Sequence, residues 1–257
     1  MPGERNGAGA GMDHGAAAAY LLAARRDGRG PPLPPGLRPA TETDAYEIQR
    51  LTMASLGPVG GWKVGAAGPQ APPSCAPLPA RGLHTSPATL SGVAFTTRDI
   101  ESEIAFVLAR DLQPRAAPYG AAEIVDAIAS CHPGIEVLQS RFADPASVDR
   151  LSHLADLIRH GAYVLGAPIA GWRAADFATV EVAQTIDGAT LRSRGNPAGD
   201  MIRLVAWLAN VGAVWAGGLR AGQIVTCGSW TGAAASPTAT RVEAAFDGAV
   251  PVMLEFA

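Results

Sequence analysis

Apolar and polar residues follow a helical period in the first part of this chain. An Ala- and Leu-rich stretch predicts a helix over residues 13–26, closed by glycines. A second helix is predicted over about residues 41–55, between a threonine cap and a glycine. The Gly-rich residues 1–12 indicate a flexible tail, and the Pro-rich residues 31–40 a connector. We therefore expect a tail followed by a small helical part that ends near residue 58.

From Gly60 onward the pattern changes to short runs of alternating and β-branched residues, which are typical of strands. Strands are predicted at 61–66, 86–95, 100–109, 134–142, 162–169, 223–230, 241–246 and 250–256, with a hairpin at 180–195. Asp187-Gly188 and Asp247-Gly248 have the composition of tight hairpin turns. Helices are predicted only at 121–130, 151–160 and 201–214. This irregular order favours an α+β fold over a doubly wound sheet or a (β/α)₈ barrel.

Charge and cysteine content restrict the class of protein. The 257 residues include 20 Lys and Arg against 23 Asp and Glu, a net charge of −3, without the basic excess of a nucleic-acid-binding protein. The cysteines Cys75, Cys131 and Cys227 form no CxxC pair, and the uncharged stretch 15–24 is too short to cross a bilayer. We expect a cytoplasmic protein with neither nucleic-acid nor membrane partners.

The basic residues are almost all arginine, because Lys63 is the only lysine in the chain. An ammonium is a compact charge whose pKa shifts on burial, and a guanidinium does not replace it in that role. Composition alone leaves a functional lysine and a chance survivor equally open.

Three glutamates interrupt apolar runs, which is unusual for charged side chains. Glu101 and Glu103 are two apart on a predicted strand, so their side chains point to the same face. By itself this pair is more typical of an edge strand facing water. Glu136 adds a third carboxylate inside another apolar run. Three such oxygen donors suit a hard cation, Mg²⁺ or Mn²⁺, with open positions for substrate.

The histidines carry a weaker signal. His153 and His160 are seven residues apart on a predicted helix and are interpreted as two polar-face histidines rather than a metal pair. His14 lies on the first predicted helix and His84 in a loop, and neither belongs to a motif.

Several motifs occur in one order along residues 13–257. They are AYEIQ (45–49), GWKVGA (61–66), IESEIAFVLARDL (100–112), PGIEVLQSRF (133–142), LAD (154–156), AYVLG (162–166), RGNPAG (194–199), WLAN (207–210), LRAGQIVTCGSWTG (219–232) and VPVMLEF (250–256). In this order they resemble the fumarylacetoacetate hydrolase superfamily. The branch of 2-keto-4-pentenoate hydratases and 4-oxalocrotonate decarboxylases is the most similar.

The resemblance implies a mixed β-sheet roll over residues 59–257, with a helical part before it. It also implies a Mg²⁺ or Mn²⁺ ion held by Glu101, Glu103 and Glu136, and a catalytic Lys63 beside a chelated 2-oxo acid. The residues expected on the substrate are Gly228, Ser229, Thr231 and Arg141. We expect a homo-oligomer, specifically a dimer, since two-fold dimers are the commonest oligomers.

Two stretches depart from the hydratase pattern. Residues 79–82 read Pro-Ala-Arg-Gly and lack an acidic residue, and residues 157–159 replace an asparagine and a serine. A hydratase-like lyase of aromatic catabolism is still the first expectation. The alternatives are a 4-oxalocrotonate-type decarboxylase, a 2-oxo acid tautomerase, a C–C hydrolase, or a non-catalytic 2-oxo acid binder or partner subunit.

Overall fold

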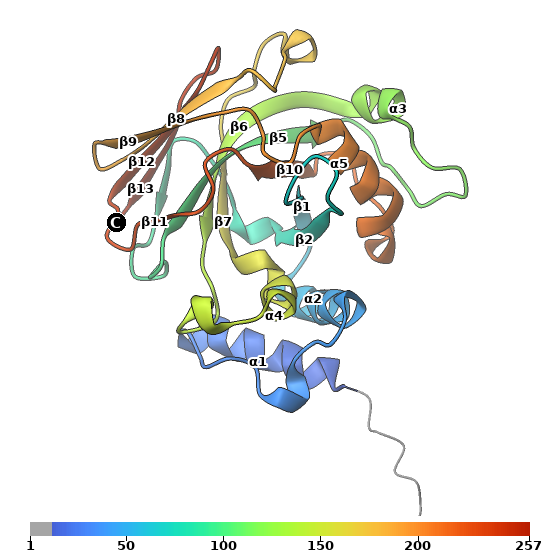
Figure 1. Cartoon of the computed structure of the whole chain (residues 1–257), viewed down its shortest axis with the longest axis vertical. Coiled ribbons are helices and arrows are strands. Elements are labelled where there is room, and N and C mark those ends of the chain that lie inside the picture. The colour runs from blue at the N-terminus through green and yellow to red at the C-terminus, as the bar shows by residue number, and fades with distance from the viewer. Residues whose placement is uncertain (1–11) are drawn as a thin grey trace, which may run out of the picture.

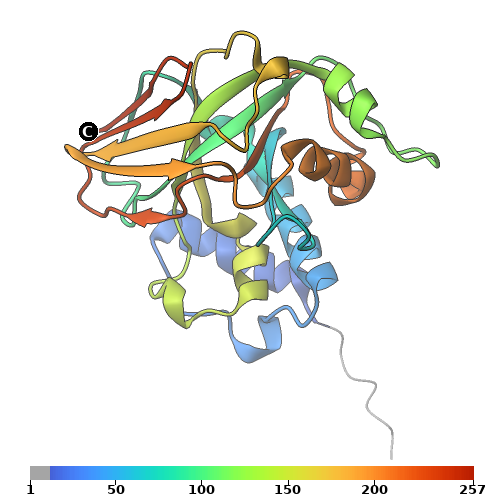
Figure 2. The same ribbon diagram turned by 45° about the horizontal axis from the view of Figure 1, so that its top comes forward.

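The computed structural model describes residues 12–257, and the tail predicted at 1–12 lies almost entirely outside them. Two β-sheets form the upper part of the molecule in Figure 1, and the N-terminal helices lie beneath the larger sheet. Turning the molecule shows the same division between sheets and helices (Figure 2). The mixed sheets with few helices confirm the predicted α+β roll.

The N-terminal helices begin and end where the sequence predicts. Asp13 caps α1 (His14–Asp27) by accepting a hydrogen bond from the amide of Ala16. Thr41 and Asp44 form a capping box at the start of α2 (Glu42–Leu56). The short α4 (Arg150–Ala155) packs on α2 and shares a buried apolar cluster with both helices.

The larger sheet has eight strands and carries the predicted site residues. Its strands are β1 (Val59–Gly65), β2 (Ser74–Pro79), β3 (Leu83–Thr85), β5 (Asp99–Leu108), β6 (Ile128–Leu138), β7 (His160–Leu165), β10 (Ile224–Ser229) and β11 (Ala234–Ala235). The order is β2-β1-β10-β5-β6-β7-β3, and β11 pairs with β5. The long antiparallel pair β5–β6 lies in the middle, so both of its strands are protected from the sheet edges.

The smaller sheet has five strands in the order β4-β13-β12-β8-β9. Its strands are β4 (Ala88–Leu90), β8 (Glu181–Ile186), β9 (Ala189–Arg194), β12 (Arg241–Phe246) and β13 (Val252–Phe256). The β8–β9 hairpin turns at Asp187-Gly188 as predicted, with Gly188 in the left-handed region at φ 89°. Residues of both sheets meet in the main apolar core, where Trp230, just after β10, packs on Phe246 of β12.

Several predicted boundaries are wrong because tertiary pairing overrides local preference. The predicted helix 121–130 is only α3 (Ala121–Asp126), and β6 begins at Ile128. The predicted helix 151–160 ends with α4 at Ala155, and His160 begins β7. In both places, pairing with a neighbouring strand places in a sheet residues for which local periodicity predicts a helix.

Other differences lie at prolines and at a helix end. The predicted strand 86–95 shrinks to β4, and the strand β2 forms in a Pro-containing segment that the pattern leaves out. The predicted helix 201–214 is α5 (Met201–Trp207), followed by a π-helical turn at Leu208–Gly212 and a 3₁₀ turn at Val214–Ala216. Further 3₁₀ turns lie at Pro35–Leu37, Ala80–Gly82, Pro145–Ser147 and Trp172–Ala174. Within residues 12–257, no helix has the length and apolar character needed to cross a bilayer.

Candidate metal centre

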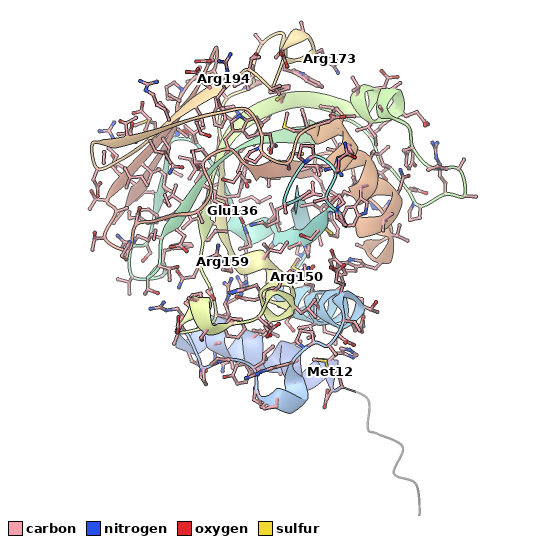
Figure 3. The ribbon with its side chains drawn as sticks, in the orientation of Figure 1. Met12, Glu136, Arg150, Arg159, Arg173 and Arg194 are labelled. Atoms are coloured by element: carbon pink, nitrogen blue, oxygen red, sulfur yellow. The ribbon has the colours of Figure 1, made fainter. Side chains whose placement is uncertain are left out.

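Three carboxylates converge on one face of the β5–β6 pair. Glu101 lies directly opposite Glu136 in the strand register, and Glu103 lies opposite Gly134. Oxygen atoms of all three glutamates lie within 4.8 Å of one another. Glu136 is completely buried and Glu103 is 2% exposed, and Figure 3 labels Glu136 near the middle of the molecule. The strand period of two therefore places Glu101 and Glu103 on one face, and the β5–β6 register adds Glu136 to complete the predicted triad.

Glu136 is held by two basic side chains from strands on either side. The Lys63 ammonium on β1 donates to Glu136 Oε2 at 2.6 Å, and His160 Nδ1 on β7 lies 2.8 Å from Oε1. Burial alone raises the pKa of Glu136, but these two partners outweigh it and lower that pKa. Glu136 is therefore an ionised carboxylate whose orientation is fixed.

The charge on Lys63 is set by its surroundings. Burial of the amine favours its neutral form, but Glu136, Glu101 and Glu103 outweigh that effect and raise the pKa of Lys63. The residue is 8% exposed and its Nζ also lies 3.4 Å from the carbonyl oxygen of Ile158. Lys63 is therefore an ammonium in a fixed position.

The other two glutamates have fewer partners. Burial and repulsion by Glu136 raise the pKa of Glu103, and the same causes raise the pKa of Glu101 against the opposing effect of Lys63. One ammonium does not balance three carboxylates at this spacing. A divalent cation with oxygen ligands removes that repulsion, so this donor set fits Mg²⁺ or Mn²⁺.

The hydroxyl groups of Thr226 and Tyr163 form a hydrogen-bonded chain that ends on the Glu103 carboxylate. Thr226 on β10 donates to the Glu103 carboxylate, and its oxygen lies 3.1 Å from the Tyr163 hydroxyl. Tyr163 reaches this point only because residue 134 is glycine, since a Cβ there meets the Tyr163 oxygen at 2.1 Å. The glycine opposite Glu103 thus makes room for Tyr163, which contacts Thr226, the residue bonded to Glu103.

A cavity of about 190 Å³ opens onto the carboxylate cluster. Its wall includes Lys63, Glu101, Glu103, Gly228 and Ser229. The Ser229 hydroxyl is buried and has no hydrogen-bond partner among the described residues. An oxygen of a small ligand in this cavity would therefore find an unused donor close to the carboxylates.

An unusual backbone turn forms another part of the cavity wall. Leu157, Ile158 and Arg159 have positive φ angles of 51°, 50° and 61°, and Ile158 lines the cavity. Non-glycine residues rarely adopt this conformation, and β-branched isoleucine least of all. Two contacts hold the turn, since Arg159 pairs with Asp99 at 3.2 Å and Lys63 donates to the Ile158 carbonyl. Such strain is typical of residues that the surrounding structure positions for function.

Two residues expected on the substrate lie elsewhere. The Thr231 hydroxyl accepts from the amide of Ser102 at 3.1 Å and lies outside the cavity wall. Arg141 is 3% exposed, pairs with Asp156 at 2.7 Å and lines a different cavity. Lys63, Gly228 and Ser229 do line the cavity beside the glutamates.

The sequence misses three residues that shape this centre. The sequence pattern predicts a helix at His160, although this residue lies on β7 against Glu136. Tyr163 and Thr226 lie within apolar runs and reveal their roles only through strand register. A polar residue inside a strand was the available signal for Thr226, as it was for Glu136.

Comparisons with known proteins agree with this arrangement. Residues 67–250 match the family model "Fumarylacetoacetate (FAA) hydrolase C-terminal". The chain is 30% identical over 139 residues to a 2-keto-4-pentenoate hydratase from Paraburkholderia xenovorans (strain LB400) and to 2-keto-4-pentenoate hydratase 3 from Pseudomonas putida. Each match covers 51% of this chain and 48% of the relative, so the chain spans about half the length of these relatives.

Solved structures share the fold over most of the chain. The 4-oxalocrotonate decarboxylase from Pseudomonas putida G7, complexed with magnesium and adipate, superimposes with a TM-score of 0.81 at 21% identity, covering 95% of this chain and 97% of that one. A fumarylacetoacetate hydrolase family protein from Yersinia pestis CO92 gives a TM-score of 0.55 at 16% identity, covering 78% and 93%. Because the family model matches most of the length of this chain, the chain belongs to the fumarylacetoacetate hydrolase family.

Proposed function

We propose that this protein is a metal-dependent lyase that acts on a small 2-oxo acid through an enolate, in the manner of a 2-keto-4-pentenoate hydratase. The convergence of Glu101, Glu103 and Glu136 beside the single lysine is the observation that carries the proposal. The curated relatives named as hydratases support it. A role in breakdown of aromatic compounds and a homodimeric assembly belong to the same proposal.

The three glutamates would hold Mg²⁺ or Mn²⁺ through carboxylate oxygens. A bound divalent ion supplies Lewis-acid polarisation of the 2-oxo group and stabilises the enolate charge. The magnesium and calcium complexes of the structurally similar decarboxylase support this assignment.

The side chains of the cavity divide the remaining work. Lys63, as an ammonium, binds the substrate carboxylate or the enolate oxygen next to Glu136. The unpaired Ser229 hydroxyl donates to a second substrate oxygen, and Gly228 lets the substrate approach the backbone. The Ile158 turn closes the side of the cavity and excludes water from it.

Decarboxylation is the second candidate, and a specific observation favours it. Among the described residues, the titratable groups in the cavity wall are Lys63, Glu101 and Glu103, and the glutamates are assigned to the metal. Hydration needs a further base to position water, whereas loss of carbon dioxide needs only a stabilised enolate and a later proton. Tautomerisation likewise needs no base to position water, whereas hydrolysis does need one.

Turnover with defined substrates separates these reactions. Magnesium-loaded protein is incubated with 2-hydroxypenta-2,4-dienoate, with loss of the dienoate absorbance as the readout, and with 4-oxalocrotonate, with carbon dioxide release as the readout. EDTA-treated protein and Glu103→Gln serve as controls, and both are expected to be inactive. If metal-loaded protein binds oxalate but turns over neither acid, the enzyme proposal fails and a 2-oxo acid-binding role replaces it.

A further inference from the structure

A second cavity, of about 440 Å³, is lined by residues from the end of α1 and from the loop between β4 and β5. Its wall contains four arginines and, among the described residues, no aspartate or glutamate. The arginines are Arg25, Arg26, Arg29 and Arg141. A cavity wall whose charged side chains are all cationic is unusual, because neighbouring like charges repel.

Hydrogen bonds hold Arg141 rigidly in this wall. Its Nε donates to Asp156 at 2.7 Å and its backbone amide donates to the same carboxylate at 3.0 Å. Its Nη2 donates to the carbonyl of His160 at 2.8 Å. Its Nη1 has no protein acceptor within residues 12–257, although the side chain is only 3% exposed. A buried, rigidly held guanidinium therefore presents an unused donor to the cavity.

Arg25 adds a second cation beside it. Its one protein hydrogen bond is a long one, 3.4 Å from Nη2 to the carbonyl of His160, and within the described chain no carboxylate pairs with it. Burial, and then repulsion by Arg141, lower the pKa of Arg25 to about 9. The nearby Arg29 makes only a 3.5 Å contact with the carbonyl of Ala143, whereas Arg26 is neutralised by Asp27.

Two hydroxyl groups of the wall also have protons to donate. The Ser140 oxygen accepts from the amide of Phe142, and the Thr96 oxygen accepts from Gln139 Nε2. Neither hydroxyl donates to an acceptor in the described part of the chain. The cavity wall is therefore rich in unused donors and contains no carboxylate, which suits the binding of an oxyanion.

Another part of the wall is apolar and consists of Val93, Ala94 and the half-buried Phe95. Together, the cationic and apolar walls select an anion that carries an organic group. We propose that this cavity binds a small organic oxyanion, a phosphate ester or a carboxylate, with its charge on Arg25, Arg29 and Arg141 and its apolar part on Phe95.

This site is separate from the carboxylate cluster and does not depend on the proposed enzymatic function. The two share only His160, whose carbonyl faces the arginines and whose ring holds Glu136. Anion binding here needs no metal ion, so it is measured in the presence of EDTA. A phosphate chelated by a metal at the glutamates is thereby excluded.

Calorimetric titrations with phenyl phosphate, inorganic phosphate and benzoate test the proposal. Phenyl phosphate is expected to bind more tightly than inorganic phosphate because its ring covers Phe95, and comparison with benzoate identifies the preferred oxyanion. Arg25→Gln and Arg29→Gln are each expected to weaken binding at least about tenfold, as loss of a charged hydrogen bond does. Arg150→Gln is the matched control, because Arg150 is exposed and pairs with Glu42 outside the cavity.

The outcomes are distinct. Binding that survives in Glu103→Gln and is lost in both arginine variants, with unchanged melting temperatures, supports the site. Failure of all three probes to bind at millimolar concentration overturns it, and so does equal weakening by Arg150→Gln. Self-association that phenyl phosphate disrupts also overturns it, because the cavity is then a contact between copies of the chain.

Discussion

Glu101 and Glu136 occupy directly opposed positions on the antiparallel strands β5 and β6, with their carboxylates on the same face. Like charges in such a pair destabilise a sheet. Lys63 neutralises Glu136, but Glu101 has no ion pair among the described residues. The folded protein therefore retains a repulsion that a divalent cation would relieve.

The first prediction follows from this repulsion. In EDTA, Glu101→Gln is expected to melt at or above the temperature of the unchanged protein, because it removes one of the opposed charges. Magnesium at a hundred times its Kd is expected to raise the melting temperature of the unchanged protein by about 5–10 °C. The same magnesium concentration should raise that of Glu101→Gln by less than half as much.

Differential scanning fluorimetry gives both readings, with Glu255→Gln as the control. Glu255 is exposed on β13, far from the cluster in the fold, so its substitution should leave the magnesium response unchanged. A Glu101→Gln protein that responds to magnesium like the unchanged protein would show that Glu101 is not a ligand.

The second prediction concerns the protonation state of Lys63. The surrounding carboxylates raise its pKa above the ordinary value of 10.5, so the ammonium persists throughout the neutral range. Because this is the only lysine, a protein labelled with ¹⁵N-lysine gives a single side-chain signal. In metal-free protein we expect no titration of that signal between pH 6 and pH 9.5. A midpoint below pH 9 would instead identify Lys63 as a neutral base.

The third prediction tests what the lysine does in turnover. Lys63→Arg keeps a positive charge but places a larger, planar group against Glu136 and Ile158. We expect it to fold and to bind magnesium, yet to lose about 10²-fold or more in kcat, the scale of a removed acid–base or charge-stabilising group. Lys63→Met should lose at least as much activity. Activity within a few-fold of the unchanged protein in Lys63→Arg would reduce the lysine to a structural charge.

The sequence reveals those parts of this centre that depend on short-range periodicity. Glu101 and Glu103 share a face because they are two apart on one strand, and Glu136 stands out as a charge inside an apolar run. The direct opposition of Glu101 and Glu136 depends on register between strands that α3 and a long loop separate. Periodicity within one strand contains no information about that register.

The residues around the triad are harder to predict for the same reason. His160 follows a helical segment, so local preference extends the helix over it, yet pairing with β6 makes it the first residue of β7. The sequence predicts Arg141 on the substrate, but the residue pairs with Asp156 and lines the arginine-lined cavity instead. Both outcomes depend on partners at least 15 residues away in the chain.

The fourth prediction concerns Gly134. A methyl group there meets the Tyr163 hydroxyl and ring at 2.1–2.7 Å, and that side chain is fully buried. Gly134→Ala is expected to destabilise the protein by about 1–3 kcal/mol through overpacking and to displace the Tyr163 hydroxyl from Thr226. Thermal unfolding measures the loss. Gly68→Ala is the control, because no atom lies within 4 Å of its added methyl group, and an equal loss in both variants would contradict the packing argument.

The fifth prediction concerns the link between α1 and α2. Asp44 accepts from His14 Nε2 at 2.9 Å and from the Thr41 hydroxyl at 2.8 Å, and these bonds lower its pKa from 3.8 to about 2. A carboxyl whose pKa is lower in the folded state stabilises the protein above the unfolded value, and this contribution disappears as pH falls from about 4 to about 2. Asp44→Ala should therefore melt a few degrees below the unchanged protein at pH 6.

The difference in melting temperature between Asp44→Ala and the unchanged protein should narrow as the pH falls below 4. Protonation of Asp44 then removes from the unchanged protein the stabilising charge that the variant already lacks. Asp126→Ala provides the comparison, since Asp126 is exposed and accepts no side-chain hydrogen bond from the described residues. Its melting temperature should follow that of the unchanged protein at every pH. A gap between Asp44→Ala and the unchanged protein that stays constant from pH 6 to pH 3 would show that Asp44 acts through packing rather than through its charge.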